Sequence, residues 1–146
     1  MNGRLRLFSD TGTDINTSNT PAHQHMKKTV IIGATTNPAR YAHLAAERLA
    51  EHGHEIVPVG IRYGEVFGRP ILDIRQRPVI REVNTVTLYI GPQHQPEWVD
   101  YILSLKPKRI IFNPGTENPE FERKARTSGI EVVEGCTLVM LSTGQF

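Results

Sequence analysis

The stretch Lys28-Thr29-Val30-Ile31-Ile32-Gly33, followed by Ala34-Thr35-Thr36-Asn37-Pro38, decides the class of fold. Its first half is a short, β-branched apolar run that ends in glycine, which is typical of a buried strand in a parallel sheet. Its second half ends with a helix-start signal, because Asn37 is a favoured N-cap residue and Pro38 suits the first helical position. The stretch therefore predicts a strand, a tight loop and a helix in succession.

The predicted helix carries its apolar residues on one face. Four of them recur at helical spacing, namely Tyr41, Leu44, Ala45 and Leu49. Gly53 marks the end of this helix, and the apolar run at 55–60 predicts a second strand. Residues 28–60 thus form a βαβ unit.

The rest of the chain continues the alternation after a weaker middle region at 61–82, where we expect turns and a short strand near Ile71. The later elements alternate between strand and helix: a strand at 85–91, a helix from Pro96 to before Pro107, a strand at 109–112, a helix from Asn118 to Gly129, and a strand at 131–134. The apolar segment 138–141 is expected to pack on the sheet. This order predicts an α/β protein with a Rossmann-like, doubly wound parallel sheet in three α/β/α layers.

The first 25 residues differ in composition from the rest. They are polar, rich in turn-forming residues and without a period, so they cannot bury enough apolar surface to offset the entropy of ordering. We predict a disordered extension at 1–25 and one domain at 26–146. Translation could also begin at Met26, which stands directly before the first strand.

Composition excludes several classes of protein. The net charge of +2 and the scattered basic residues argue against a nucleic-acid partner, and no apolar run reaches the ~18–20 residues of a membrane span. The single cysteine, Cys136, excludes a disulfide framework and favours a reducing, cytoplasmic setting. It is expected to be buried and structural rather than reactive toward a ligand thiol. His52 and His54 lack a third ligand, so no metal site is predicted.

The loop after the first strand is a candidate anion site. Unpaired N–H groups and the positive end of a helix dipole both favour an anion at such a position. Only Gly33 matches the G-x-G-x-x-G fingerprint, since Thr35 and Pro38 stand in the other glycine places. Arg40 follows one turn into the helix and can supply charge. Two interpretations stay open: a phosphate cradle, or an ordinary strand-to-helix turn. The candidate contacts are small or polar: Gly33, Ala34, Thr35, Thr36, Asn37 and Pro38.

The end of the second strand argues against NAD. An NAD site places a carboxylate there to hold the ribose, whereas this chain has Gly60-Ile61-Arg62. Arg62 would suit a ribose phosphate, as in NADP or coenzyme A, although a solvated loop arginine is the alternative. Two more loops should meet at the same edge of the sheet and complete a pocket: Ile90-Gly91-Pro92 and Asn113-Pro114-Gly115-Thr116-Glu117-Asn118. Gly91, Pro92, Asn113, Pro114 and Gly115 are the candidate contacts in them.

A family resemblance selects the cofactor. The chain resembles the small stand-alone CoA-binding domain proteins, which are similar to the CoA-binding domain of the succinyl-CoA synthetase α subunit. The resemblance covers about 28–141 and rests on these residues: Val30-Ile31-Ile32-Gly33-Ala34-Thr35, Pro38, Arg40, Pro58-Val59-Gly60, Glu65-Val66-Phe67-Gly68-Arg69, Gly115, Ala125, Gly129-Ile130 and Cys136. The family often has Ser in place of Thr35, and an Asn-Pro pair in place of Gly60-Ile61.

The resemblance implies how coenzyme A would lie. Residues 33–38 would cradle its phosphates, and Gly60 with Arg62 would lie near the adenosine or its 3′-phosphate. Gly91-Pro92 would line the nucleotide, and residues 113–115 would follow the pantetheine arm.

The sequence favours a non-catalytic module that binds coenzyme A or acyl-CoA. It shows no nucleophile–base pair, and the synthetase reaction needs a second domain and an ATP-binding partner, for which the chain has no room. An NADP-dependent reductase, or a CoA-ligase component acting with a separate subunit, is the alternative. An interaction domain with a vestigial pocket is a third.

Overall fold

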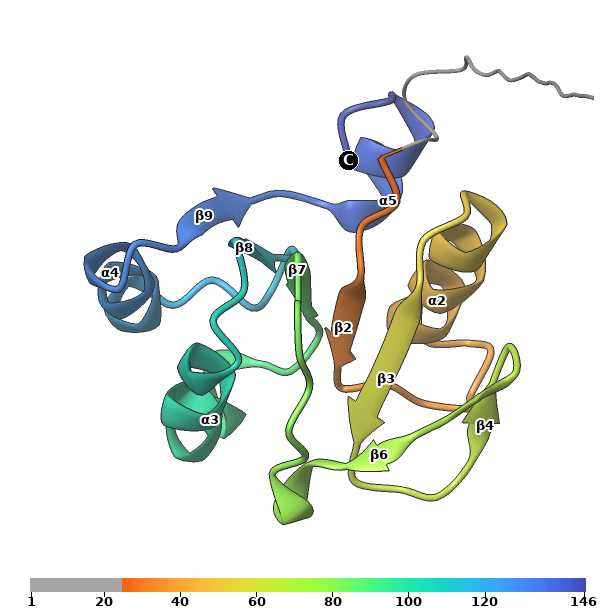
Figure 1. Cartoon of the computed structure of the whole chain (residues 1–146), viewed down its shortest axis with the longest axis horizontal. Coiled ribbons are helices and arrows are strands. Elements are labelled where there is room, and N and C mark those ends of the chain that lie inside the picture. The colour runs from red at the N-terminus through yellow and green to blue at the C-terminus, as the bar shows by residue number, and fades with distance from the viewer. Residues whose placement is uncertain (1–24) are drawn as a thin grey trace, which may run out of the picture.

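The computed structural model describes residues 25–146, so all of the predicted extension except His25 lies outside the described residues. A six-stranded sheet forms its centre, in the order β6-β3-β2-β7-β8-β9, and all of its neighbouring strands are parallel (Figure 1). The chain runs outward from β2 first in one direction and then in the other, which confirms the doubly wound topology. The strands are β2 Thr29–Ile32, β3 Ile56–Gly60, β6 Leu72–Asp73, β7 Thr85–Leu88, β8 Arg109–Phe112 and β9 Glu131–Glu134.

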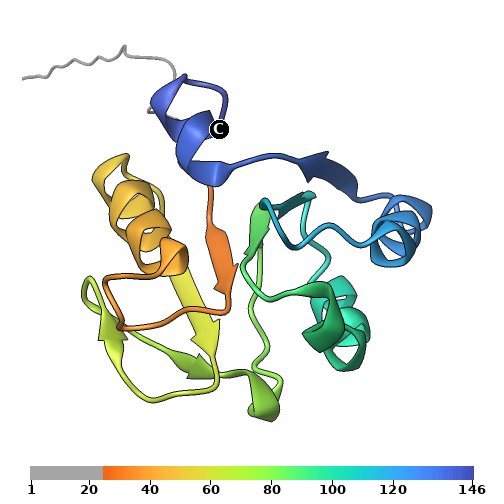
Figure 2. The ribbon, with the colours of Figure 1, turned by 180° about the vertical axis from the view of Figure 1, so that it is seen from behind.

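Helices cover both faces of this sheet, as Figures 1 and 2 show from opposite sides. One apolar cluster joins the sheet to α2 and α5, and the other joins it to α3 and α4. The α-helices are α2 Tyr41–Glu51, α3 Val99–Ser104, α4 Pro119–Thr127 and α5 Thr137–Ser142, and the 3₁₀-helices are η3 Ile74–Gln76, η4 Pro92–His94 and η5 Pro96–Trp98. The three-layer α/β/α prediction is confirmed.

Strand side chains alternate between the two clusters because successive residues point to opposite faces. Val30 and Ile32 of β2 are fully buried toward α3 and α4, and Ile31 is fully buried toward α2 and α5. The parallel register places Val86 and Ile110 level with Val30, so each layer of the core is continuous across the sheet. Burial on both faces explains why β2 is a continuous apolar run rather than an alternating one. In β7 the alternate residues are threonines, and these are buried as well.

The start of α2 differs from the prediction. The Asn37 side chain accepts a hydrogen bond from the Ala39 N–H at 3.0 Å, and the Arg40 N–H donates to the Asn37 carbonyl at 3.1 Å. These bonds close a separate turn, so the helix begins at Tyr41 with Arg40 as its N-cap residue. The predicted inward face was wrong at Tyr41, which is 74% exposed. The buried face consists of Ala42, Ala45, Ala46 and Leu49.

Two other predicted elements have different bounds, because β7 ends at Leu88 rather than at 91 and Pro96 opens the 3₁₀-helix η5 ahead of α3. The cap of α4 is confirmed, because Asn118 accepts a hydrogen bond from the Phe121 N–H. The short strand near Ile71 is β6, and it comes after a hairpin of β4 (Glu65–Val66) and β5 (Arg69–Pro70) that the turn signals did not predict. The apolar tail forms α5, which packs through Leu141 and leaves Val139 exposed.

Candidate functional site

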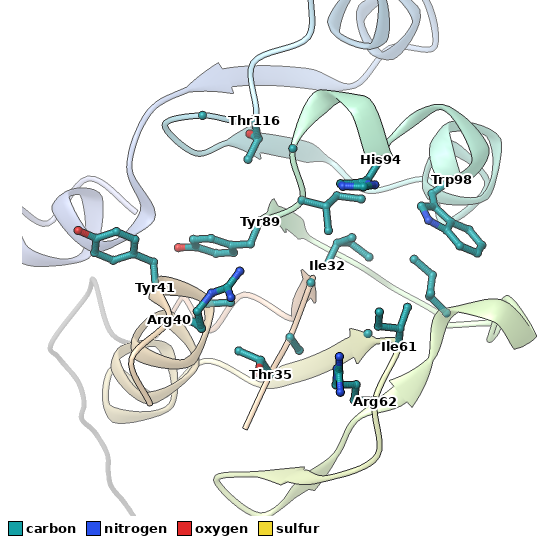
Figure 3. A pocket seen from close by; sticks show the side chains of 18 of the residues that line it. Ile32, Thr35, Arg40, Tyr41, Ile61, Arg62, Tyr89, His94, Trp98 and Thr116 are labelled. Carbon is teal, nitrogen blue, oxygen red and sulfur yellow. The ribbon is translucent and has the colours of Figure 1, made fainter. Parts of the chain in front are cut away.

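A cavity of about 700 Å³ opens at the carboxyl ends of the strands, where the loops after β2, β3, β7 and β8 meet (Figure 3). Its volume lies within the range of roughly 300–1,000 Å³ that small-molecule sites occupy. The chain crosses from one side of β2 to the other at this point, and ligands of doubly wound sheets bind at such a switch. This cavity is therefore the candidate ligand pocket.

The structure brings most of the predicted site residues together around this pocket. Those that line it are Gly33, Ala34, Thr35, Arg40, Gly60, Arg62, Gly91, Pro114 and Gly115. Those that do not line it are Thr36, Asn37, Pro38, Pro92 and Asn113. Four loops that are distant in the sequence thus converge. The loop after β3 contributes both of its predicted residues, and each of the other three contributes only part.

Two glycines let the loop after β2 lie against the end of β3. The Gly33 and Ala34 N–H groups both donate to the Val59 carbonyl, at 2.9 and 3.0 Å. Gly33 has φ of +95°, which side chains rarely adopt, and a Cβ atom on Gly60 would lie 2.6 Å from the Ala34 carbonyl oxygen. Glycine at these two positions forms the floor of the pocket.

The amino end of α2 offers donors to the pocket. Tyr41 and Ala42 both line it, and within the described part of the chain their N–H groups donate to no acceptor. The first N–H groups of a helix have no partner inside the helix, and they carry the positive end of its dipole. The Thr35 hydroxyl accepts a hydrogen bond from the Asn37 N–H at 3.1 Å, so its own proton is left to donate.

Three arginines line the pocket, and they differ in their partners. Arg75 donates to the Asp73 carboxylate at 2.9 Å and to the Ile61 carbonyl at 3.1 Å, and this hydrogen bonding lowers the pKa of Asp73. Among the residues that the structure describes, Arg40 and Arg62 form no ion pair. Their charges are available to an anion, while that of Arg75 is largely compensated.

Sequence reasoning missed the apolar wall of the pocket except for Ile90, which it placed at this edge of the sheet. The wall consists of Ile32, Ile61, Ile74, Ile90, Tyr89 and Trp98. Figure 3 shows Trp98 and His94 on the opposite side of the pocket from Arg40 and Thr35. Tyr89 and Ile90 directly follow β7, so the end of that strand was a usable signal.

Burial raises the pKa of Tyr89 to about 12, against the opposing effect of the nearby Thr137 and Thr87 hydroxyls. Its phenol is therefore neutral at physiological pH.

Asn113 has its hydrogen-bonding groups occupied by the protein itself. Its side-chain amide donates to the Thr87 hydroxyl at 2.7 Å and to the Leu88 carbonyl at 2.9 Å, and its oxygen accepts from the Thr137 N–H at 2.9 Å. The residue is 2% exposed. It joins the ends of β7 and β8 to the start of α5 beneath the pocket.

Other candidate chemistry lies away from this pocket. Cys136 is half-buried before α5 and does not line the pocket. The His54 ring accepts a hydrogen bond from the Lys27 N–H at 3.0 Å. Across residues 25–146 no group of three or more histidine, cysteine or acidic residues is arranged to hold a metal ion. None of the described helices has the length and apolar character needed to cross a membrane.

Comparison with known proteins places the same part of the chain in one family. Residues 27–142 match the family model described as a CoA binding domain. A crystal structure of an uncharacterized protein is 63% identical, has a TM-score of 0.80, and covers 83% of this chain and 98% of its own. A hypothetical protein from Pyrococcus horikoshii OT3 is 27% identical, with a TM-score of 0.71 over 83% of this chain and 85% of its own. A Thermus thermophilus protein, 24% identical, shares the fold with a TM-score of 0.75 over 86% of this chain and 94% of its own. No curated protein matches the sequence.

Proposed function

The chain belongs to the CoA-binding domain family, and we propose that its pocket binds coenzyme A, free or acylated, as a non-catalytic module. The observation that carries the proposal is the distribution of charge and apolar surface around one cavity. Arg40, Arg62 and the amino end of α2 supply positive charge, and an apolar wall faces them. Coenzyme A combines the matching parts, because it has a diphosphate and a 3′-phosphate together with a flat adenine and a neutral pantetheine arm.

Different residues hold different parts of the ligand in this proposal. Thr35, Arg40 and the free N–H groups of Tyr41 and Ala42 hold the diphosphate, since helix amino ends and arginine both favour phosphate. Arg62 pairs with the 3′-phosphate beyond the end of β3. The loops at Gly91 and at 114–115 border the pantetheine arm. Asn113 supports these loops from below, and we assign it no contact with the ligand.

We propose that the module acts in the cytoplasm, because a chain with one cysteine cannot form the internal disulfides typical of proteins in oxidising compartments. An NADP-dependent reductase, or a CoA-ligase component working with a separate subunit, is the alternative. Both alternatives would use the same pocket with a further protein or substrate domain.

A thermal-shift series tests the proposal with coenzyme A, NADPH and NADH on the same preparation. Ligand that binds only the folded state adds about 2.7 kcal/mol at about 100 times Kd, which raises Tm by several degrees. We expect that rise with coenzyme A and a smaller one or none with the nicotinamide cofactors. A larger shift with NADPH than with coenzyme A would favour the NADP-dependent reductase. No shift with any of the three would contradict the proposal that the pocket binds a nucleotide.

The non-catalytic part of the proposal has its own test. Acetyl-CoA incubated with the protein should be recovered unchanged by chromatography. Conversion to free coenzyme A above the rate in buffer would show that the module is an enzyme.

A further inference from the structure

Gln95 is a fully buried polar residue that stands outside the pocket and between two of its loops. It is 0% exposed and lies between η4 and η5, after the end of β7. A buried amide is costly unless its donors and acceptor are satisfied. The hydrogen-bond partners of Gln95 therefore show which parts of the structure this side chain holds together.

Those partners are the walls of the pocket. The side-chain amide of Gln95 donates to the Ile90 carbonyl at 2.9 Å and to the Thr116 carbonyl at 2.8 Å, and both residues line the pocket. Ile90 belongs to the loop after β7, and Thr116 belongs to the loop after β8. One side chain thus joins two loops that no strand pairing holds together at this level.

The third partner extends this connection to α4. The Gln95 side-chain oxygen accepts a hydrogen bond from the Asn118 side-chain amide at 2.9 Å, and Asn118 in turn caps α4. Both donors and the acceptor of Gln95 are used, so the spacing between the two loops and the helix is fixed by geometry and not only by packing.

We propose that Gln95 is a positioning residue for the ligand pocket: it fixes the separation of the Ile90–Gly91 and Pro114–Thr116 walls without touching the ligand. This inference rests on the proposed function, since it assumes that the ligand occupies this pocket. A pocket whose walls are held at the right distance before binding loses less conformational entropy when the ligand binds, so its affinity for the ligand is higher.

The test compares Gln95→Met with the matched control Gln93→Met. Methionine is unbranched and similar in length, and it removes all three hydrogen bonds. Gln93 lies two residues away in η4, is exposed and does not line the pocket. We expect Gln95→Met to raise the Kd for coenzyme A roughly 10- to 100-fold, because the buried Thr116 carbonyl and the part-buried Ile90 carbonyl lose their donors. Gln93→Met should keep the wild-type Kd.

A second variant keeps the inference testable if Gln95→Met does not fold. Asn118→Ser retains a side-chain oxygen for the helix cap but removes the donor to Gln95, so we expect a smaller rise in Kd with α4 intact. Two readouts separate positioning from a general loss of stability. Amide hydrogen exchange without ligand should quicken at 90–95 and 114–118 but not in β2, and the emission of the single tryptophan, Trp98, should change in the free protein.

The outcomes distinguish this inference from the proposed function. If wild-type protein does not bind coenzyme A, the proposed function fails, whatever the exchange data show. If wild-type protein binds and a folded Gln95→Met variant binds equally well with unchanged exchange in both loops, Gln95 does not position the pocket.

Discussion

Arg40 and Arg62 carry the positive charge that the pocket offers to an anion. They lie on different elements, one before α2 and one after β3, and neither has a carboxylate partner within the described chain. A charge-assisted hydrogen bond to phosphate stabilises a complex more than a neutral one does. Because they come from different loops of one pocket, they could pair with two phosphate groups of one ligand, and this is the residue-scale core of the proposed function.

Removing either arginine should therefore weaken binding of coenzyme A. We expect Arg40→Ala and Arg62→Ala each to cost about 1–3 kcal/mol of binding free energy, measured by isothermal titration. Arg62→Ala should lose its effect with dephospho-coenzyme A, which lacks the 3′-phosphate. Arg48→Ala is the control, because Arg48 lies in the last turn of α2 beside Glu51 and away from the pocket. Wild-type affinity in both test variants would contradict the assigned anion contacts.

Single residues were predicted well where the signal was local. Gly33 and Gly60 could be placed at the pocket from strand ends alone, because a tight turn and a close approach of two main chains both require glycine. Asn113 shows the limit. Its position after β8 was predictable, but its partners Thr87 and Thr137 are distant in the sequence, so its support role appears only in the fold.

At the scale of elements, two Asn-Pro pairs show how far a capping signal can be trusted. Asn118-Pro119 begins α4 as predicted, whereas Asn37-Pro38 belongs to a turn that ends before α2. The residue types are the same, but only Asn118-Pro119 leads directly into a helix. The turn at 37–40 places the amino end of α2 against the pocket, and this arrangement depends on the whole sheet edge rather than on the local sequence.

This difference predicts unequal costs of removing the two side chains. Asn118→Ala should be less stable than Asn118→Ser by about 1 kcal/mol in denaturant unfolding, because serine keeps the cap and both variants lose the bond to Gln95. The matched pair Asn37→Ala and Asn37→Ser should differ by less. An equal difference at the two positions would mean that Asn37 caps α2 after all.

At the scale of the whole molecule, the two ends of the sheet have different surroundings. The pocket occupies the carboxyl ends of the strands, and a cluster of aromatic and basic groups lies near the other end. There the centroid of the Phe146 ring lies 4.9 Å from that of the His54 ring and 4.4 Å from the Cζ atom of Arg109. The Lys27 side chain donates a hydrogen bond to the Phe146 carbonyl at 2.6 Å. Burial, together with the neighbouring charges of Lys27, His52 and Arg109, lowers the pKa of His54.

The lowered pKa of His54 predicts how stability depends on pH. A histidine that binds its proton more weakly in the folded state than in the unfolded one favours unfolding when it is protonated. Its contribution to stability is thus present above the ordinary histidine pKa of about 6.5 and is lost as pH falls below that value. His54→Asn keeps an acceptor for the Lys27 N–H and should flatten the fall in unfolding free energy between about pH 7.5 and 5.5. The matched variant His52→Asn should retain most of the fall, because burial is the first cause of the shift and the charge of His52 is only one of the later ones. An unchanged pH profile in His54→Asn would contradict the assignment.

The fold as a whole was predictable because the four central strands, β2, β3, β7 and β8, are buried and largely apolar, and each long helix has one apolar face. The middle region was not, since β4, β5, β6 and η3 are too short to show a period. That region nevertheless supplies Ile74 and Arg75 to the pocket. Sequence reasoning therefore missed Ile74 and Arg75, whereas Arg40 and Arg62 follow long predicted strands and were found.

Isothermal titration of the full chain with coenzyme A tests the central claim most directly. The proposed function predicts saturable heat with about one ligand per chain, since the described residues form one such cavity at the strand ends. Acetyl-CoA is expected to compete at the same site. No heat of binding at millimolar coenzyme A would contradict the claim, whatever the family to which the chain belongs.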